Sequence, residues 1–328
     1  MIKLEKETPL PMPTITPLSQ AGMPMTRSSP EQKIRAALPV IRFLQTSIPL
    51  PIARWFLDKS LKAKRLGPET IRKHLTAAGV PCQWIIPQEA QKDQVLLYFH
   101  GGGFVFGLTP QHLEMAEYLA HQTDLRILMV DYRLAPEHPY PAALDDCAAA
   151  YHWLLNQDIP ADEIAVAGDS AGGNLALTLM MRLHSGGFPL PAAAACLSPA
   201  ADLTLKDQES DGFQDPLLPP KAVQRYKQAY AGNKDPHNPL ISPVYGSFQG
   251  LPPLLVHVGE DEILRADAER ITDLAQAANV EVRLKIYPGM WHVWQLFLSL
   301  PQAVQSLNEI AAFLKLHLSR ETQPADSA

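Results

Sequence analysis

Apolar and polar positions follow one another along the chain in blocks that predict a strand and then a helix, several times over. Short runs bounded by turn residues predict strands, and longer segments rich in Leu, Ala and Met predict helices. The predicted strands are 82–87, 94–100, 126–131, 164–169, 192–198, 253–259 and 282–287; the predicted helices between and after them are 110–122, 141–156, 171–185, 265–278 and 301–318. This alternation predicts an α/β fold, with a mostly parallel central sheet and helices on both faces.

Two amphipathic segments precede the first of these strands, at 31–47 and 52–63. Charged residues and prolines interrupt their apolar stretch, so no uncharged run approaches the ~20 residues that a transmembrane helix needs. We expect a pair of cap helices that lay their apolar faces over the core, and attachment to a membrane surface stays open.

A second extra segment, 202–232, interrupts the alternating pattern. It is polar at first and helical over 220–230, and we expect it to complete the cap. The expected organisation is an N-terminal arm with cap helices (1–80), a first core part (81–201), the cap insertion (202–232), a second core part (233–320) and a mobile tail (321–328).

Composition narrows the function classes. The 328 residues are 46% apolar and 19% charged, which supplies one large globular core with a smaller appended element. The net charge of −6 and the absence of a basic stripe argue against nucleic acid as a partner. Three cysteines without a C-x-x-C pair, Cys82, Cys147 and Cys196, favour reduced thiols in the cytoplasm, and the charged, proline-rich start is unlike a signal peptide.

The first candidate for chemistry is Ser170, in the run Gly168-Asp169-Ser170-Ala171-Gly172. This G-x-S-x-G pattern lies between a predicted strand and a predicted helix, which is the context of a nucleophile elbow. Small residues on both sides suit a sharp strand-to-helix turn. We therefore predict that Ser170 is a covalent nucleophile at a helix N-terminus.

A glycine-rich run, His100-Gly101-Gly102-Gly103, directly follows residues Gln94–Phe99 of a predicted buried strand. Three consecutive glycines are costly to order, so such a run makes sense where the main chain itself must approach a ligand. The run lacks the features of a phosphate loop. We predict that the N–H groups of Gly102, Gly103 and Ala171 form an oxyanion hole, and that His100 orients the loop.

With these motifs the chain resembles the hormone-sensitive-lipase family of α/β-hydrolase esterases, which carries an HGGG loop ahead of a GDSAGG elbow. The resemblance extends over about residues 80–318 and includes the stretch that begins Asp131-Tyr132-Arg133-Leu134-Ala135-Pro136-Glu137. In that stretch we expect Arg133 and Glu137 to pair with each other. The resemblance implies an α/β-hydrolase fold with a cap, and activity on esters with short to medium acyl chains.

A serine nucleophile needs a base and an acid that orients the base, and in α/β-hydrolases the chain order is Ser, Asp or Glu, then His. His292 follows the last predicted strand and is the expected base. Glu260, Asp261 and Glu262 follow the strand 253–259. The residues alone do not show which carboxylate reaches the imidazole; the family pattern favours Asp261, with Glu262 as the alternative.

These elements predict a serine carboxylesterase that works through an acyl-enzyme on a small-molecule ester, with no cofactor and no metal. An amidase or lactonase using the same triad, and a non-catalytic ligand-binding protein on the same scaffold, are the alternatives. A homodimer through the strand 282–287 or the last helix stays open.

Overall fold

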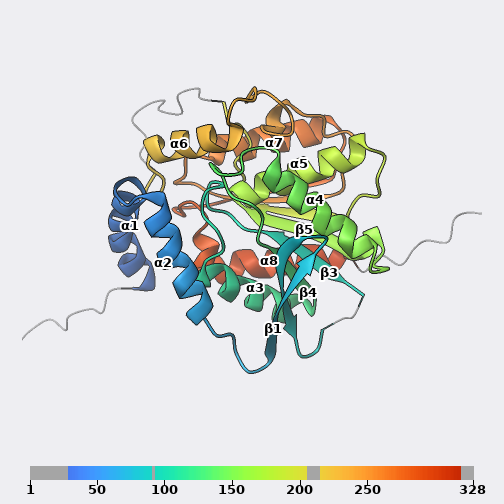
Figure 1. Cartoon of the computed structure of the whole chain (residues 1–328), viewed down its shortest axis with the longest axis horizontal. Helices are drawn as coiled ribbons and strands as arrows, with labels where there is room; N and C mark the ends of the chain where they lie inside the picture. The colour runs from blue at the N-terminus through green and yellow to red at the C-terminus, as the bar shows by residue number, and fades with distance from the viewer. Residues whose placement is uncertain (1–28, 91–92, 205–214, 319–328) are drawn as a thin grey trace, which may run out of the picture.

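The structure is a computed structural model that describes residues 29–90, 93–204 and 215–318. One twisted sheet with helices on both faces forms its centre (Figure 1). The strands are β1 (Thr70–Ala77), β2 (Val80–Pro87), β3 (Val95–Phe99), β4 (Arg126–Val130), β5 (Ile164–Asp169), β6 (Ala193–Leu197), β7 (Leu254–Gly259) and β8 (Val282–Tyr287). The helices are α1 (Pro30–Ser47), α2 (Leu50–Ala63), α3 (Pro110–Thr123), α4 (Ala142–Leu155), α5 (Ala171–Ser185), α6 (Pro220–Ala231), α7 (Arg265–Ala277) and α8 (Pro301–Leu318), with short 3-10 turns at Ala161–Glu163, Pro243–Tyr245 and Trp294–Leu296.

The strands lie in the order β1-β2-β4-β3-β5-β6-β7-β8. β2 is antiparallel to both of its neighbours, and the six strands β3 to β8 are parallel to one another. The predicted α/β fold and its seven strands are therefore confirmed. β1 lies inside the segment 1–80 and was not predicted, because its sequence is largely polar and most of its residues are exposed or only partly buried. It joins β2 through Ala78 and Gly79, both at positive φ, as in a tight hairpin turn.

Two helical layers cover the sheet, and alternate residues of the strands point to them. In β3, Val95, Leu97 and Phe99 belong to the core with α4, α5 and α7. Leu96 and Tyr98 point to the opposite face, which α3 and α8 cover. Because β3 is buried on both faces, its whole sequence is apolar, as expected of a central parallel strand.

The chain changes direction across the sheet at β3, which has β4 on one side and β5 on the other. In open α/β sheets such a switch point leaves a crevice at the carboxyl ends of the strands. The loops that follow β3, β5, β7 and β8 begin at this edge. These are the loops that carry the glycine run, Ser170, the acidic cluster and His292.

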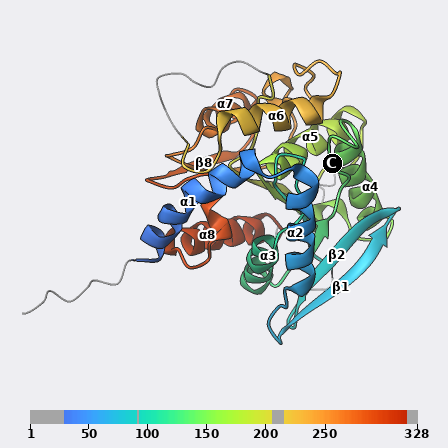
Figure 2. The same ribbon diagram turned by 60° about the vertical axis from the view of Figure 1, so that its left-hand side comes forward.

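Three helices lie outside the two layers, and we call α1, α2 and α6 the outer helices. α1 packs against α6, and α2 against α3. Figure 2 shows α1 and α2 on the face turned towards the viewer. Their bounds agree with the predicted helices 31–47, 52–63 and 220–230. Of the predicted insertion, 205–214 lie outside the described residues, as do residues 1–28 and 319–328, which include the predicted tail. Within the described ranges, no helix is long and apolar enough to cross a membrane.

The predicted Arg133–Glu137 pair is wrong. Arg133 instead binds Asp146 on α4, with Nη2 2.8 Å from Oδ1. Glu137 accepts from Arg54 of α2, with Nη1 2.8 Å from Oε2. The two side chains thus tie the same loop to different elements, and only one of those elements belongs to the core.

Candidate active site

Ser170 occupies the sharp turn between β5 and α5, as the motif predicts. Its backbone has φ 54° and ψ −114°, a conformation that is rare and strained for a residue with a side chain. The turn brings α5 very close to β3: a Cβ placed on Gly172 would lie 1.9 Å from the carbonyl oxygen of Phe99. Only glycine fits at position 172, so the close approach of helix and strand explains this residue of the motif.

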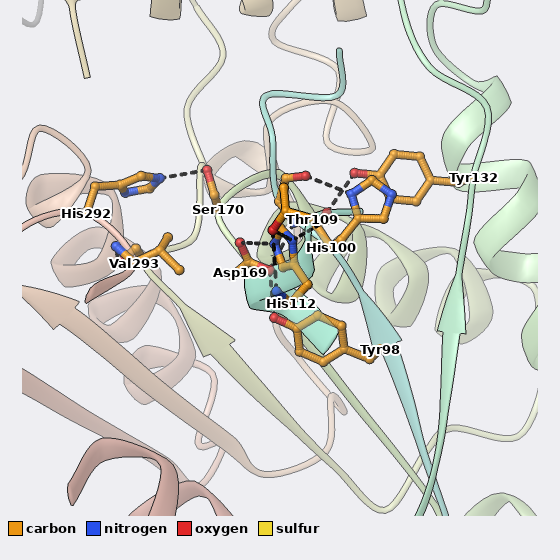
Figure 3. A network of polar contacts seen from close by, with 11 residues as sticks. Tyr98, His100, Thr109, His112, Tyr132, Asp169, Ser170, His292 and Val293 are labelled. Atoms are coloured by element: carbon orange, nitrogen blue, oxygen red, sulfur yellow. Dashed lines mark hydrogen bonds and ion pairs between the residues drawn. The ribbon is translucent and has the colours of Figure 1, made fainter. Parts of the chain in front are cut away.

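The His292 side chain lies beside the serine. Its Nε2 is 2.9 Å from Oγ of Ser170 (Figure 3), and both side chains are buried. The other ring nitrogen, Nδ1, is 2.6 Å from Oε2 of Glu262. A carboxylate accepts a hydrogen bond, so this contact places the proton on Nδ1 and leaves Nε2 free to accept the serine proton.

The carboxylate at His292 is Glu262, and the prediction that Asp261 would take this place is wrong. The Asp261 side chain is 40% exposed and points to Arg35 of α1, whose Nη2 lies 3.7 Å from its Oδ2. The Asp261 N–H donates to the carbonyl of Met290, which ties the acidic loop to the histidine loop. That backbone pairing turns the Asp261 side chain outward and the next one, Glu262, inward.

Further contacts fix Glu262 in its orientation. Its Oε1 accepts from the hydroxyl of Ser198, 2.7 Å away, and from the N–H of Gly259. The same Ser198 hydroxyl accepts from the N–H of Val293, next to His292. Ser198 therefore links the acid to the histidine loop, and sequence reasoning missed it because a serine after a strand carries no motif.

The pKa of the His292 imidazole lies above its ordinary value of 6.5. Burial alone lowers the pKa, but the hydrogen bond to Glu262 and the negative charge of that carboxylate outweigh it, with smaller contributions from Asp215 and Asp169. The pair thus favours the imidazolium form. A histidine that takes up a proton during a reaction benefits from this arrangement.

The glycine run after β3 curls over the edge of the sheet. Gly102 and Gly103 have φ of 110° and 61°, where a side chain is strained, and a Cβ on Gly103 would lie 2.7 Å from the ring of Tyr226 in α6. Among the described residues, the N–H groups of Gly102, Gly103 and Ala171 donate no hydrogen bond. These three predicted donors are thus unpaired, with Ala171 at the N-terminus of α5.

Asp169, the residue before the serine, anchors the same loop from below (Figure 3). Its buried Oδ1 accepts from the Tyr98 hydroxyl at 2.6 Å and from the N–H of Gly101 at 2.9 Å, and its Oδ2 faces Nε2 of His112 at 3.3 Å. Burial raises the pKa of Asp169, but His112 and Tyr98 together hold it below the ordinary value. The carboxylate therefore stays charged and positions the loop.

His100, which was predicted to orient the glycine run, lies beside this network and contacts Gly101 of the run. Its Nδ1 is 2.7 Å from the carbonyl of Gly101, and its ring stacks on Tyr132 at 4.2 Å. Burial lowers its pKa to about 4, so the ring is neutral near pH 7. His112 of α3 is joined to Asp169, and sequence reasoning missed it; the signal that could have found it is the Thr109–His112 pair that caps α3.

Three arginines connect the outer helices to the site loops. Arg54 of α2 donates to the carbonyl oxygens of Val105 and Ala135, beyond the glycine run. Arg35 of α1 donates to the carbonyl of Gly289 on the histidine loop. Arg42 donates to the carbonyl of Asp215, whose carboxylate in turn accepts from the N–H of Ile263 in the acidic loop.

A hollow of about 390 Å³ opens beside α1. It is lined by Arg35, Leu38, Pro39, Arg42 and Pro216. None of these residues belongs to the Ser170–His292–Glu262 group, so the hollow is separate from that group. Within the described ranges, no cluster of His, Cys, Asp and Glu side chains could hold a metal ion.

Comparison with known proteins places this geometry in a family. A family model described as alpha/beta hydrolase fold matches residues 96–296, which is more than half of the chain. The chain belongs to the α/β-hydrolase family. The resemblance to its hormone-sensitive-lipase branch is also supported: the chain superposes on a crystal structure of an esterase from the bacterial hormone-sensitive lipase family with a TM-score of 0.82. The two are 38% identical, and the match covers 89% of this chain and all of the other.

Relatives of this α/β-hydrolase include named enzymes. An esterase of Acinetobacter venetianus is 39% identical over 261 residues, which are 78% of this chain and 86% of that protein. An acetyl-hydrolase of Streptomyces hygroscopicus is 36% identical over 244 residues, 74% of this chain and 81% of the other.

Proposed function

We propose that this α/β-hydrolase is a serine carboxylesterase in which Ser170, His292 and Glu262 form the catalytic triad. The family and its esterase relatives make the chain an ester hydrolase. The observation that carries the triad is the unbroken hydrogen-bonded chain from the Ser170 hydroxyl through both nitrogens of His292 to the Glu262 carboxylate.

The proposed reaction has two halves. Nε2 of His292 takes the proton of Ser170 as Oγ attacks the ester carbonyl, and the resulting imidazolium returns that proton to the leaving alcohol. Water then attacks the acyl-enzyme in the same way and releases the acid. Glu262 holds the Nδ1 proton and stabilises the positive charge that forms on the ring.

The negative oxygen of each tetrahedral intermediate needs donors that are already in place. The unpaired N–H groups of Gly102, Gly103 and Ala171 are our proposal for this oxyanion hole. Removal of one such donor typically costs about 2.7 to 4 kcal/mol of transition-state stabilisation. Asp169 supports the proposed hole because it holds the N–H of Gly101 and with it the start of the loop.

The proposed substrates carry short to medium acyl chains. One relative is named an acetyl-hydrolase. In addition, Tyr226 of α6 packs directly against Gly103 and limits the room above the glycine run. We further propose that the enzyme works in the cytoplasm, since its three cysteines are buried free thiols. The homodimer through β8, an edge strand of the sheet, stays a prediction.

Two measurements test the esterase proposal. A labelled serine-reactive phosphonate followed by peptide mapping should modify Ser170, and modification of another residue alone would refute the nucleophile. Matched aryl ester and anilide substrates separate the reaction classes: we expect the ester to be cleaved faster. Preference for the anilide would indicate an amidase, and turnover of neither would favour a binding protein.

A further inference from the structure

Six large apolar side chains are exposed on the outer helices, and we call them the apolar patch. Val40, Phe43 and Leu44 lie on α1, and Ile52, Trp55 and Phe56 lie on α2, each between 41% and 65% exposed. Within each helix the three positions are spaced i, i+3, i+4, so they share one face. Soluble proteins rarely expose so many large apolar side chains together unless the surface binds something.

The apolar patch is grouped around the turn between the two helices. α1 ends at Ser47 and α2 begins at Leu50, so the apolar residues near the end of α1 meet those near the start of α2. Figure 2 shows this turn on the face nearest the viewer. The rings of Trp55 and Phe56 contact each other edge to face, with centroids 4.8 Å apart. The opposite sides of the helices point inward through Leu38, which is buried, and Arg54.

The segment that forms α1 and α2 has a net positive charge, whereas the whole chain has a net negative charge. Residues 30–65 contain eight lysines and arginines but only two acidic residues, in a chain whose net charge is −6. Three of the arginines point inward to the site loops. The exposed cations are Lys33, Lys59, Lys62 and Arg65, and of these Lys62 forms an exposed ion pair with Asp58. Nζ of Lys59 lies 5.1 Å from the centroid of the Trp55 ring, so apolar and cationic groups share one surface.

This charge decides between the two occupants that an apolar face could have. A second copy of the chain, docked through a twofold axis, would bring two basic faces together, and their repulsion would oppose the contact. An anionic lipid surface satisfies both features, because phosphates attract the lysines while aromatic and aliphatic side chains enter the boundary between headgroups and acyl chains.

We propose that the outer face of α1 and α2 is a docking surface for anionic lipid bilayers. Helices with Trp, Phe and Leu on one side and nearby lysines lie in the plane of the interface rather than across it. In α2 the apolar positions are followed on the same side by Lys59 and Lys62, so that Trp55 enters the membrane while the lysines remain among the headgroups. Docking would bring the segment just after the glycine run, where Arg54 of the same helix contacts Val105, close to the lipid surface.

The test uses the full chain and vesicles of two compositions, phosphatidylcholine alone and phosphatidylcholine mixed with phosphatidylglycerol. We expect co-flotation with the mixed vesicles, weakened by salt, together with a blue shift of tryptophan emission as Trp55 leaves water. The shift should disappear in the Trp55→Phe variant while flotation persists. Absence of flotation with the mixed vesicles, or equal flotation with both compositions at every salt concentration, would overturn the proposal.

Surface variants locate the docking site. We expect Trp55→Ser combined with Phe56→Ser to weaken vesicle binding about tenfold or more, and Lys59→Glu combined with Lys62→Glu to abolish the preference for anionic lipid. Phe188→Ser, at another side chain that is 50% exposed but lies outside α1 and α2, is the matched control and should bind normally.

Hydrolysis of a water-soluble aryl ester shows that each variant is folded, and it should be unchanged in all of them. Because the vesicle assay needs no turnover, it also separates this proposal from the proposed esterase activity. Unchanged vesicle binding by the Trp55→Ser, Phe56→Ser variant would place the docking surface elsewhere and overturn the assignment. A dimer in sedimentation that the same variant converts to a monomer would also overturn it, in favour of a second copy.

Discussion

The loops at the strand ends and the outer helices hold the candidate site in different ways. At the strand ends, buried side chains such as Asp169, Glu262 and Ser198 each make two or more hydrogen bonds, and each holds a loop that carries a reacting group or a proposed oxyanion donor. The outer helices reach the same loops through partly exposed arginines that donate to backbone carbonyls. Buried networks tolerate little change, whereas exposed contacts are screened by water, so the core should determine the chemistry and the outer helices should adjust it.

The largest effect should come from the centre of the core network. We expect Ser170→Ala to lower kcat on a soluble aryl ester on the order of 10⁶-fold, since the residual rate then comes from the oxyanion donors and binding alone. The melting temperature should not fall, because the alanine variant loses no side-chain contact other than the hydrogen bond to His292. Activity within tenfold of the parent enzyme would show that Ser170 is not the nucleophile. The contrast between the strand-end loops and the outer helices would then be wrong.

The two neighbouring acids offer the sharpest comparison, because one faces the core and the other faces an outer helix. Glu262→Gln keeps the shape but removes the charge that orients and stabilises the imidazolium, and we expect kcat to fall about 10³- to 10⁴-fold. Asp261→Asn removes only a half-exposed ion pair with Arg35, worth about 1 kcal/mol or less, so its kcat/KM should change less than about fivefold. Steady-state kinetics of the two variants measure both values.

The reverse order of these two losses would show that the acidic loop rearranges when substrate binds. Asp261 would then be the residue at His292 in the working enzyme. Equal and large losses would point instead to disruption of the whole loop, which circular dichroism and thermal melting of both variants would reveal.

The pH profile reports on the same pair. His292 acts as a base only when neutral, so kcat/KM should rise with pH through the pKa of His292, with a midpoint above 6.5, and fall about tenfold per unit below it. In Glu262→Gln the hydrogen bond and charge that raise the pKa are weakened while burial still lowers it, so the midpoint should move to lower pH. The Asp261→Asn profile is the control and should coincide with that of the parent. A midpoint in Glu262→Gln that does not move would show that Glu262 does not set the pKa.

The sequence predicted the parts of the fold and site that depend on local pattern. Apolar periodicity predicted the seven central strands, and the motifs placed Ser170 and the glycine loop on the correct turns. β1 was missed because its polar sequence is stabilised by pairing with β2 rather than by burial. The choice between Asp261 and Glu262 depends on a backbone hydrogen bond from Asp261 to Met290, 29 residues further along the chain, and local sequence carries no trace of such a contact.

The same reasoning explains the wrong partner for Arg133. Arg133 and Glu137 are four residues apart and opposite in charge, so proximity in sequence suggested a pair. The loop that carries them is not helical, and Asp146 and Arg54 approach it from two separate helices. The choice of Asp261 and the Arg133–Glu137 pair were both wrong because long-range contacts determine these partners. Each error involves a residue that an outer helix contacts.

A smaller effect than that of Glu262→Gln tests the outer helices themselves. Arg54 is 21% exposed, and it donates to Val105 and Ala135 as well as to Glu137. We expect Arg54→Ala to raise KM about tenfold with a smaller change in kcat, because charged hydrogen bonds of this kind contribute about 1.5 to 3 kcal/mol and position the glycine loop without touching the reacting atoms. Glu137→Gln removes only the more exposed contact and should change KM less than about twofold. If Arg54→Ala instead lowered kcat as strongly as Glu262→Gln, the outer helices would be part of the chemistry, and the division between a determining core and an adjusting surface would be wrong.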